Sequence, residues 1–253
     1  MTYTIIFLTL IVTIAALRNR TLFNRLALIP YRVNHNREWW RVITHGFVHA
    51  DYIHLAVNMV VLLSFGQFIE QFFDAYTQIG LISNGDAWYL LLYFGGMICA
   101  SIYDLVRYRN NPAYASIGAS GAVAAVVFTS IFFNPWGKLY LLGIIPIPGI
   151  IFGLLYIGYS SYMGRRQGER INHFAHLFGA LYGFLFPLLM VSSLPMFSLK
   201  VKTLSLRSNV RRYALLLGTA MLVAAMQLAG LLWAIVFYIL LSATERRDEQ
   251  NRQ

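Results

Sequence analysis

The sequence predicts an all-α, polytopic membrane protein in which a bundle of apolar helices crosses the bilayer. Of its 253 residues, 58% are hydrophobic and only 12% are charged, whereas soluble domains carry roughly 25% charged residues. The apolar residues gather into stretches of about 20, which is the length that a helix needs to cross the hydrocarbon core. These proportions exclude a soluble domain, and the single Cys99 excludes an internal disulfide.

Seven stretches are apolar enough to be membrane spans. Positive charges follow the first stretch rather than precede it, so we expect a retained helix and not a cleaved signal peptide. The first and fourth spans are the shortest, and the fifth contains Pro146 and Pro148, which predict a kinked or broken helix. The predicted spans cover residues 2–18, 52–70, 87–106, 118–134, 139–160, 173–193 and 213–242.

The connection between the first two spans, residues 19–48, is long, basic and aromatic. Aromatic rings at headgroup depth and arginines that reach phosphate predict a partly embedded interfacial structure. A plain amphipathic connector is the alternative. The net charge of +10 would also suit nucleic acid, but the basic residues fall between apolar segments, beside Trp and Tyr. We therefore predict the lipid bilayer as a partner, and no nucleic acid.

Ser120 stands between two glycines, Gly118 and Gly121, where the fourth span begins. Glycines allow backbone conformations that other residues avoid. The free N–H groups of a helix N-terminus favour developing negative charge. This layout suits a nucleophile whose product is an oxyanion. The motif alone is weak, because Ala122 stands where the nucleophile elbow of soluble hydrolases needs glycine.

The sixth span offers a base for this serine. Gly179 and Gly183 lie three and seven residues after His176, on the same helix face, and small residues at that spacing let another helix pack closely. If that neighbour carries Ser120, the imidazole and the hydroxyl meet. A pair without an acid is chemically acceptable, since the third member of a triad mainly orients and stabilises the imidazole.

The second span adds polar side chains inside the membrane. His54 and Asn58 are four residues apart and share a helix face, so they are candidate donors to an oxyanion. His45, His49 and His54 could bind a metal, but their spacings of four and five residues match no zincin-like motif. Hydrogen bonding of loop to helix is the alternative for His45 and His49. Glu70 lies about 18 Å further along the helix, so we expect it at the opposite end.

Together these pieces resemble the rhomboid family of intramembrane serine proteases. They occur in the order of the family, over roughly residues 1–195. The matching pieces are Trp40 with Arg41; His49, His54, Asn58, Gly66 and Glu70; residues 118–121; and His176 with Gly179 and Gly183.

The resemblance implies a rhomboid-like core of six transmembrane helices in residues 1–195. A basic linker at 196–212 and an extra C-terminal transmembrane helix with a polar tail at 213–253 would then give the 6+1 form. The protein would be a multi-pass integral protein, which we expect in the inner membrane of a bacterium.

The resemblance also implies a catalytic dyad of Ser120, the nucleophile, and His176, the general base. His54 and Asn58 would bind the oxyanion beside the backbone N–H of Ser120, and His49 and Gly118 would support the site. We expect structural roles for Trp40, Arg41, Gly121, Gly179, Gly183 and Glu70.

Members of the family cleave transmembrane segments of other proteins near the membrane face, without metal or cofactor. The implied substrates are therefore single-span or polytopic membrane proteins. Two positions depart from the family pattern. Ala124 replaces an aromatic residue that stacks on the catalytic histidine in some members, so His176 must be oriented another way. Asn172 replaces an acid found in many members, and we expect that position to be peripheral.

The orientation of the chain does not follow from charge alone. Seven alternating spans put 14 Lys and Arg on the side of the first loop and 6 on the other, which would place that loop in the cytoplasm. Without the embedded loop the counts are 8 and 6, which is no real bias. The resemblance implies a first loop outside, and we follow it.

Two other functions stay open. A non-catalytic rhomboid-like protein would bind client helices and thin the membrane around them, although the intact pair of Ser120 and His176 argues against it. A transporter that uses intramembrane histidines as proton relays would keep its flux after the loss of Ser120.

Overall fold

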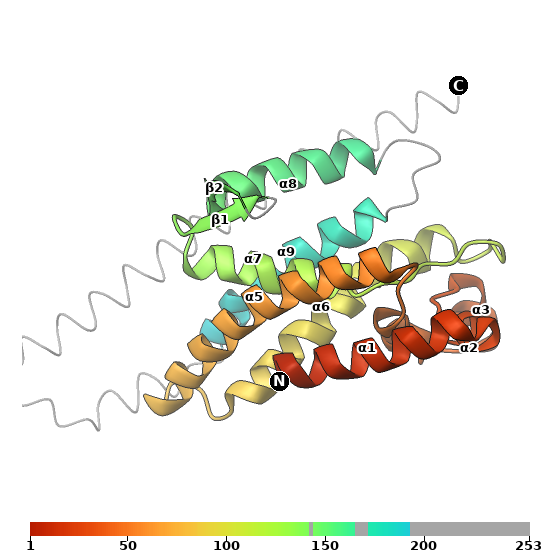
Figure 1. Cartoon of the computed structure of the whole chain (residues 1–253), viewed down its shortest axis with the longest axis horizontal. Coiled ribbons are helices and arrows are strands. Elements are labelled where there is room, and N and C mark those ends of the chain that lie inside the picture. The colour runs from red at the N-terminus through yellow and green to blue at the C-terminus, as the bar shows by residue number, and fades with distance from the viewer. Residues whose placement is uncertain (142–143, 165–171, 193–253) are drawn as a thin grey trace, which may run out of the picture. The chain divides into compact units, whose positions relative to one another are not determined.

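The structure, a computed structural model, describes residues 1–141, 144–164 and 172–192. These residues fold into helices, with one short two-stranded hairpin (Figure 1). The predicted linker at 196–212 and the predicted extra helix at 213–253 lie outside the described residues. In chain order the elements are α1 (Thr2–Arg18), α2 (Arg20–Leu26), α3 (Pro30–Asn36), α4 (Arg41–Thr44), the 3-10 helix η1 (His45–Phe47), α5 (Tyr52–Gln78), α6 (Gly85–Arg107), α7 (Ser120–Phe133), β1 (Lys138–Leu141), β2 (Ile145–Pro148), α8 (Gly149–Met163) and α9 (His173–Ser192).

Six of the described helices are apolar and correspond to the first six predicted spans. Helices α5, α6 and α9 are long and apolar enough to cross a membrane, and α1, α7 and α8 are shorter apolar helices. The prediction of a helical membrane bundle is confirmed. With 14 residues, α7 is about 21 Å long, which is less than the roughly 30 Å of hydrocarbon in a bilayer.

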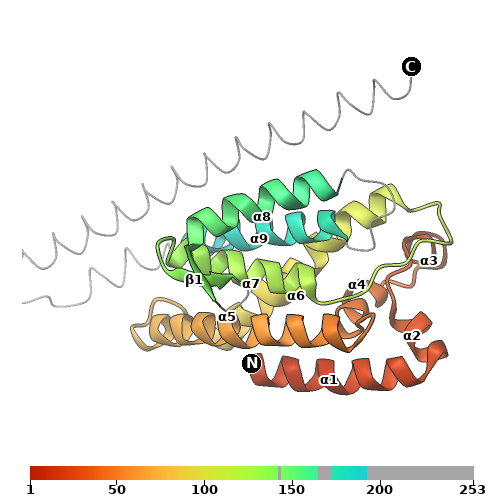
Figure 2. The same ribbon diagram turned by 45° about the horizontal axis from the view of Figure 1, so that its top comes forward.

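Helix α7 lies among α5, α6, α8 and α9 (Figures 1 and 2). All of its residues from 121 to 131 are buried. A helix that is apolar on every side needs such a surrounding, because it has no polar face to turn outward. The helix that begins with Ser120 is therefore the core element of the described bundle.

Helices α7 and α9 touch backbone to backbone. A Cβ atom added at Gly179 would overlap the carbonyl oxygen of Gly121, and one at Gly183 would overlap that of Ala125. The hydroxyl of Thr129 on α7 also donates to the carbonyl oxygen of Gly183, at 2.6 Å. The glycine face of the sixth span is thus the packing face, and its neighbour is the helix of Ser120.

The connection between α1 and α5 forms short helices held together by Arg41. This side chain is only 1% exposed, and its Nη1 donates to the carbonyl oxygens of Asn24 and Ala27 at 2.8 and 2.7 Å. Its Nε also pairs with Glu38. The expectation that the arginines of this loop reach lipid phosphate is therefore wrong for Arg41. Trp40 is half-exposed, as an interfacial aromatic residue would be.

Glu70 lies toward the far end of α5, away from His54, as expected. Its carboxylate accepts the backbone N–H of Thr2 at 3.1 Å and pairs with the amino group of Met1. The hydroxyl of Thr2 in turn donates to that of Tyr89 on α6, at 2.8 Å. Glu70 therefore fixes the start of α1 against α5 and α6.

The prediction for the fifth span is wrong in its first part. Strands β1 and β2 pair as an antiparallel hairpin in which Tyr140 faces Pro146, and α8 begins only at Gly149. Pro146 and Pro148 lie in β2, where a residue without an N–H is tolerated in a strand at the sheet edge. They end the hairpin and do not kink α8. A proline does lie inside α9, at Pro187.

The α7–α9 contact gives a stability prediction. Gly183→Ala should lower the free energy of unfolding by about 1–3 kcal/mol, because the new methyl group meets the backbone of α7 and forces the helices apart. Gly158→Ala in α8 is the matched control, since an added Cβ there meets nothing within 4 Å. Thermal unfolding in detergent micelles measures both, and equal stability of the two variants would contradict the packing described.

Candidate active site

Ser120 and His176 meet at the start of their two helices. The Oγ atom of Ser120, the first residue of α7, lies 2.7 Å from Nε2 of His176 in the first turn of α9. This distance is within the range for a nucleophile and its base. When the neutral ring carries its proton on Nδ1, Nε2 accepts a hydrogen bond from the Ser120 hydroxyl. The contact predicted from the sequence is therefore present.

An aromatic ring from α8 lies beside the imidazole. The rings of Tyr156 and His176 are nearly parallel, at an angle of 21°, with centroids 6.2 Å apart. The ring of His173 approaches His176 edge-on, with centroids 6.0 Å apart. His176 is thus oriented from α8 and from its own helix, since Ala124 of α7 offers no ring. Tyr156 could not be predicted from the sequence, because the register of one span against another is not visible there.

The loop before Ser120 depends on glycine at position 118. Gly118 has a φ of +113°, which side chains rarely adopt. Its N–H donates to the carbonyl oxygen of His45 at 3.0 Å. A Cβ atom added there would lie 2.8 Å from Cε1 of His54. Both backbone conformation and space therefore require glycine at this position.

His49 holds the next residue of the same loop. Its Nε2 accepts the N–H of Ala119 at 3.4 Å, and its Nδ1 lies 3.0 Å from the hydroxyl of Thr13 on α1. That hydroxyl donates its hydrogen to the carbonyl oxygen of Phe47, so it must accept from Nδ1–H of His49. The ring is therefore neutral, with its proton on Nδ1. Burial, and then the neighbouring His54, lower the pKa of His49 to about 3.

His54 and Asn58 extend from the serine loop along α5. The ring of His54 lies between Gly118 and His49, with the two imidazole centroids 5.0 Å apart. Asn58 is buried one turn further on, and its Nδ2 donates to the carbonyl oxygen of His54 at 2.9 Å. The second hydrogen of that amide is not used by this bond. The structure thus places His54 against the serine loop and Asn58 one helical turn further along α5.

The first turn of α7 keeps its N–H groups available. Ala119, which precedes the helix, provides no side-chain cap. The first N–H groups of a helix have no carbonyl partner one turn earlier. They point out of the start of the helix, where they favour negative charge. The helix start can therefore stabilise an oxyanion that forms on a group attacked by this serine.

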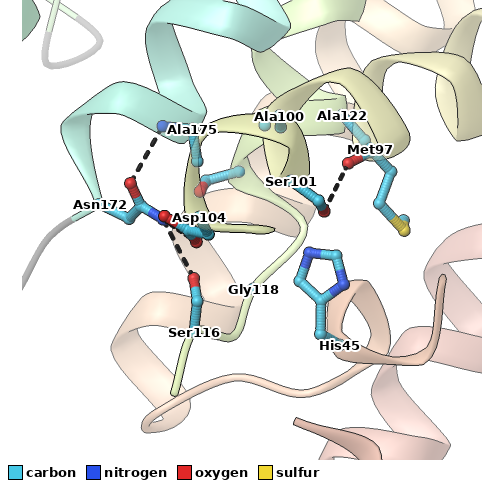
Figure 3. Close-up of a pocket in the computed structure, with 12 residues that line it drawn as sticks. His45, Met97, Ala100, Ser101, Asp104, Ser116, Gly118, Ala122, Asn172 and Ala175 are labelled. Atoms are coloured by element: carbon cyan, nitrogen blue, oxygen red, sulfur yellow. Dashed lines mark hydrogen bonds between the residues drawn. The ribbon is translucent and has the colours of Figure 1, made fainter. Parts of the chain in front are cut away.

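A small cavity adjoins Ser120 on the side of α6 (Figure 3). Figure 3 shows Asp104, Ser116 and Asn172 together on one side of it and His45 with Ser101 on the other. Polar cavities of this kind favour water. Its lining comprises His45, Met97, Ala100, Ser101, Asp104, Ser116, Gly118, Ser120, Gly121, Ala122, Asn172 and Ala175.

Asn172 is not peripheral, and that expectation is wrong. Its Oδ1 accepts the N–H of Ala175 at 3.0 Å, which caps α9 one turn before His176. Its Nδ2 donates to Asp104 of α6 at 2.6 Å. Asp104 is not among the site residues predicted from the sequence. An acid inside a predicted span is costly in free energy, and that cost is the signal that could have identified it.

Residues 36–193 match the Rhomboid domain. The chain belongs to the rhomboid family. It is an integral membrane protein, and its apolar helices fit that membership.

Several relatives carry the same domain. RHOMBOID-like protein 12, mitochondrial, from Arabidopsis thaliana is 30% identical over 154 residues, which are 55% of this chain and 43% of that protein. The putative rhomboid protease YdcA from Bacillus subtilis (strain 168) is 32% identical over 157 residues, 62% of this chain and 69% of that protein. Rhomboid protease GluP from the same organism is 26% identical over 147 residues, 58% of this chain and 25% of that protein. The chain thus spans less than half the length of some of the curated rhomboids that it matches.

The Tyr156 ring should determine the reactivity of this rhomboid's serine. Tyr156→Ala should slow the labelling of Ser120 by a fluorophosphonate about tenfold, because the imidazole loses an aromatic neighbour that restricts its orientation. Tyr156→Phe keeps the ring and should label at nearly the wild-type rate. Leu155→Ala is the control, since this side chain of α8 is 60% exposed. Equal slowing by the Phe and Ala variants would contradict a role for the ring.

The buried histidines beside the serine predict a pH dependence of folding. Burial lowers the pKa of His45 to about 4 and that of His49 to about 3, from an ordinary value of 6.5. Between pH 6.5 and the lowered pKa of each ring, the imidazole gains a proton in the unfolded chain but not in the folded protein. The free energy of unfolding is therefore highest above pH 6.5 and falls as the pH drops toward 4.

For each ring the fall is at most about 1.4 kcal/mol per pH unit. Thermal unfolding in detergent between pH 7.5 and 4.5 measures it. His49→Gln should show a shallower slope than the wild type. The same slope in both proteins would exclude His49 as a source of the effect.

Proposed function

We propose that this rhomboid is an intramembrane serine endopeptidase in which Ser120 is the nucleophile and His176 the general base. The observation that carries the proposal is the 2.7 Å contact between Oγ of Ser120 and Nε2 of His176. The relatives named rhomboid proteases in Bacillus subtilis (strain 168) support it. The domain boundaries proposed for the chain are those expected above, with the protease core in residues 1–195.

The proposed reaction passes through an acyl-enzyme. As Oγ of Ser120 attacks the carbonyl carbon of a substrate peptide bond, Nε2 of His176 takes the hydroxyl proton. The carbonyl oxygen becomes an oxyanion beside the first N–H groups of α7, with the side chains of His54 and Asn58 as further donors. His176 then gives its proton to the leaving amine, and the C–N bond breaks. Water attacks the resulting ester in the same way and frees Ser120.

Hydrolysis at this depth needs both water and an extended substrate. The cavity beside Ser120 has polar groups on two sides, which suits water. A transmembrane substrate must unwind before its peptide bond reaches the serine, so substrates with helix-breaking residues should be preferred. We therefore propose single-span or polytopic membrane proteins, cut near the membrane face, as the substrate class.

The proposed location is the inner membrane of a bacterium, with the first loop on the outer side. The relatives from Bacillus subtilis (strain 168) favour a bacterial membrane. Other relatives carry mitochondrial or chloroplastic names. A cysteine-accessibility scan of residues 246–253 would report the side on which the chain ends.

Cleavage should depend on both members of the dyad. Co-expression with a tagged single-span substrate should yield a cleaved fragment with the wild type, and none with Ser120→Ala or His176→Ala, because neither variant can form the acyl-enzyme. Ser130→Ala is the matched control, since this buried hydroxyl on the same helix donates to the backbone carbonyl oxygen of Val127, within α7.

Immunoblotting of the fragment provides the measurement, and a fluorophosphonate probe should label the wild type at Ser120. Equal cleavage of the substrate by the wild type and Ser120→Ala would contradict the proposed protease function. Substrate capture without cleavage by the wild type would instead favour a non-catalytic binder. Transport that survives Ser120→Ala would favour the proton-relay alternative.

A further inference from the structure

A buried carboxylate on α6 joins the two segments that carry the dyad. Asp104 lies near the end of α6 and is 1% exposed. A buried carboxylate is costly unless hydrogen bonds compensate for the lost water. Here Nδ2 of Asn172 donates to Oδ2 at 2.6 Å, and the hydroxyl of Tyr114 donates to Oδ1 at 2.9 Å. The two donors come from different segments of the chain, and Nδ2 of Asn172 lies 3.4 Å from the hydroxyl oxygen of Tyr114.

The Asn172 side of this junction leads directly to His176. Oδ1 of Asn172 accepts the N–H of Ala175, and the backbone carbonyl of Asn172 accepts that of His176 at 3.3 Å. The amide group that is fixed by Asp104 is therefore the one that caps the first turn of α9. A shift of Asn172 would move the helix start, and the imidazole would move with it.

The Tyr114 side leads to Ser120. Tyr114 stacks on Tyr108 with ring centroids 3.7 Å apart. Ser116, two residues later, has its Oγ atom 3.1 Å from Nδ2 of Asn172. Its backbone pairs with Leu28 through two hydrogen bonds of 2.9 and 3.0 Å. The chain then continues through Gly118 to Ser120, so the same junction also fixes the approach to the nucleophile.

We propose that Asp104 is a positioning residue, which acts through Asn172 and Tyr114 to hold His176 and Ser120 at reacting distance. The inference rests on the proposed protease function and adds a residue to it. Asp104 itself touches neither reacting atom in the hydrogen bonds described. Its effect follows from geometry, because a misplacement of about 1 Å in a catalytic group costs up to about 10²-fold in rate.

The test is a double-mutant cycle on the full-length protein in detergent, with a fluorogenic transmembrane peptide as substrate. Asp104→Ala and Asn172→Ala should each lower kcat about 10²-fold with KM nearly unchanged, because the groups that bind substrate stay in place. The double variant should lose less than the product of the two single losses, since both changes break the contact between Asp104 and Asn172. Additive losses would show that Asp104 does not act through Asn172.

Conservative variants separate positioning from folding. Asp104→Asn keeps an acceptor for Asn172 and should recover most of the lost kcat. Tyr114→Phe removes a single hydroxyl and should lower kcat about tenfold, while the protein stays folded. It keeps the test valid if Asp104→Ala does not fold. Ser130→Ala is again the matched control for the loss of a buried polar group.

The failures of the inference and of the proposed function can be told apart. If the wild type cleaves and Ser120→Ala does not, but Asp104→Ala, Asp104→Asn and Tyr114→Phe all keep wild-type kcat, Asp104 has no positioning role. Loss of kcat only in proportion to loss of folded protein would have the same meaning. If wild type and Ser120→Ala cleave equally, the proposed function fails and the inference falls with it.

Discussion

The close contact between α7 and α9 is the constraint on which the site depends. Helices in lipid gain little from the hydrophobic effect on pairing, so small residues and interhelical hydrogen bonds must bring them together. Gly121 follows Ser120 directly, and Gly179 lies one turn after His176, so the glycine contact forms one turn from the dyad. A side chain at Gly179 would separate α7 from α9 close to the point where the Ser120 hydroxyl meets the imidazole.

Helix packing alone leaves the direction of the serine open, and the first loop supplies it. Gly118 and Ala119 donate their N–H groups to His45 and His49, while Ser116 pairs with Leu28. The segment before Ser120 is therefore held along its length by residues 28–49. This explains how a loop between α1 and α5 belongs to the site, although none of its residues touches Oγ of Ser120 in the hydrogen bonds described.

The sequence predicted the polar site residues whose burial in a membrane costs free energy. Ser120, His54 and His176 stood out because polar groups inside a span need a reason, and the glycine spacing predicted which face of α9 is packed. It could not predict Tyr156, because periodicity shows the face of a helix but not the register against its neighbour. The hairpin before α8 was also missed, because short apolar runs suit a buried strand and a helix equally well.

The surroundings of His176 bear on how the proposed dyad could act without a third residue. In a triad a carboxylate next to the imidazole fixes its direction and tautomer, but inside a membrane protein that charge would need further donors of its own. Here the acid, Asp104, has no hydrogen bond to His176 among those described. It accepts hydrogen bonds from Asn172 and Tyr114 instead. In the proposed arrangement Asp104 acts on the imidazole through the Asn172 cap of α9, and the ring of Tyr156 lies beside the imidazole. On this proposal a helix cap and an aromatic ring together orient the base, and neither places a charge beside it.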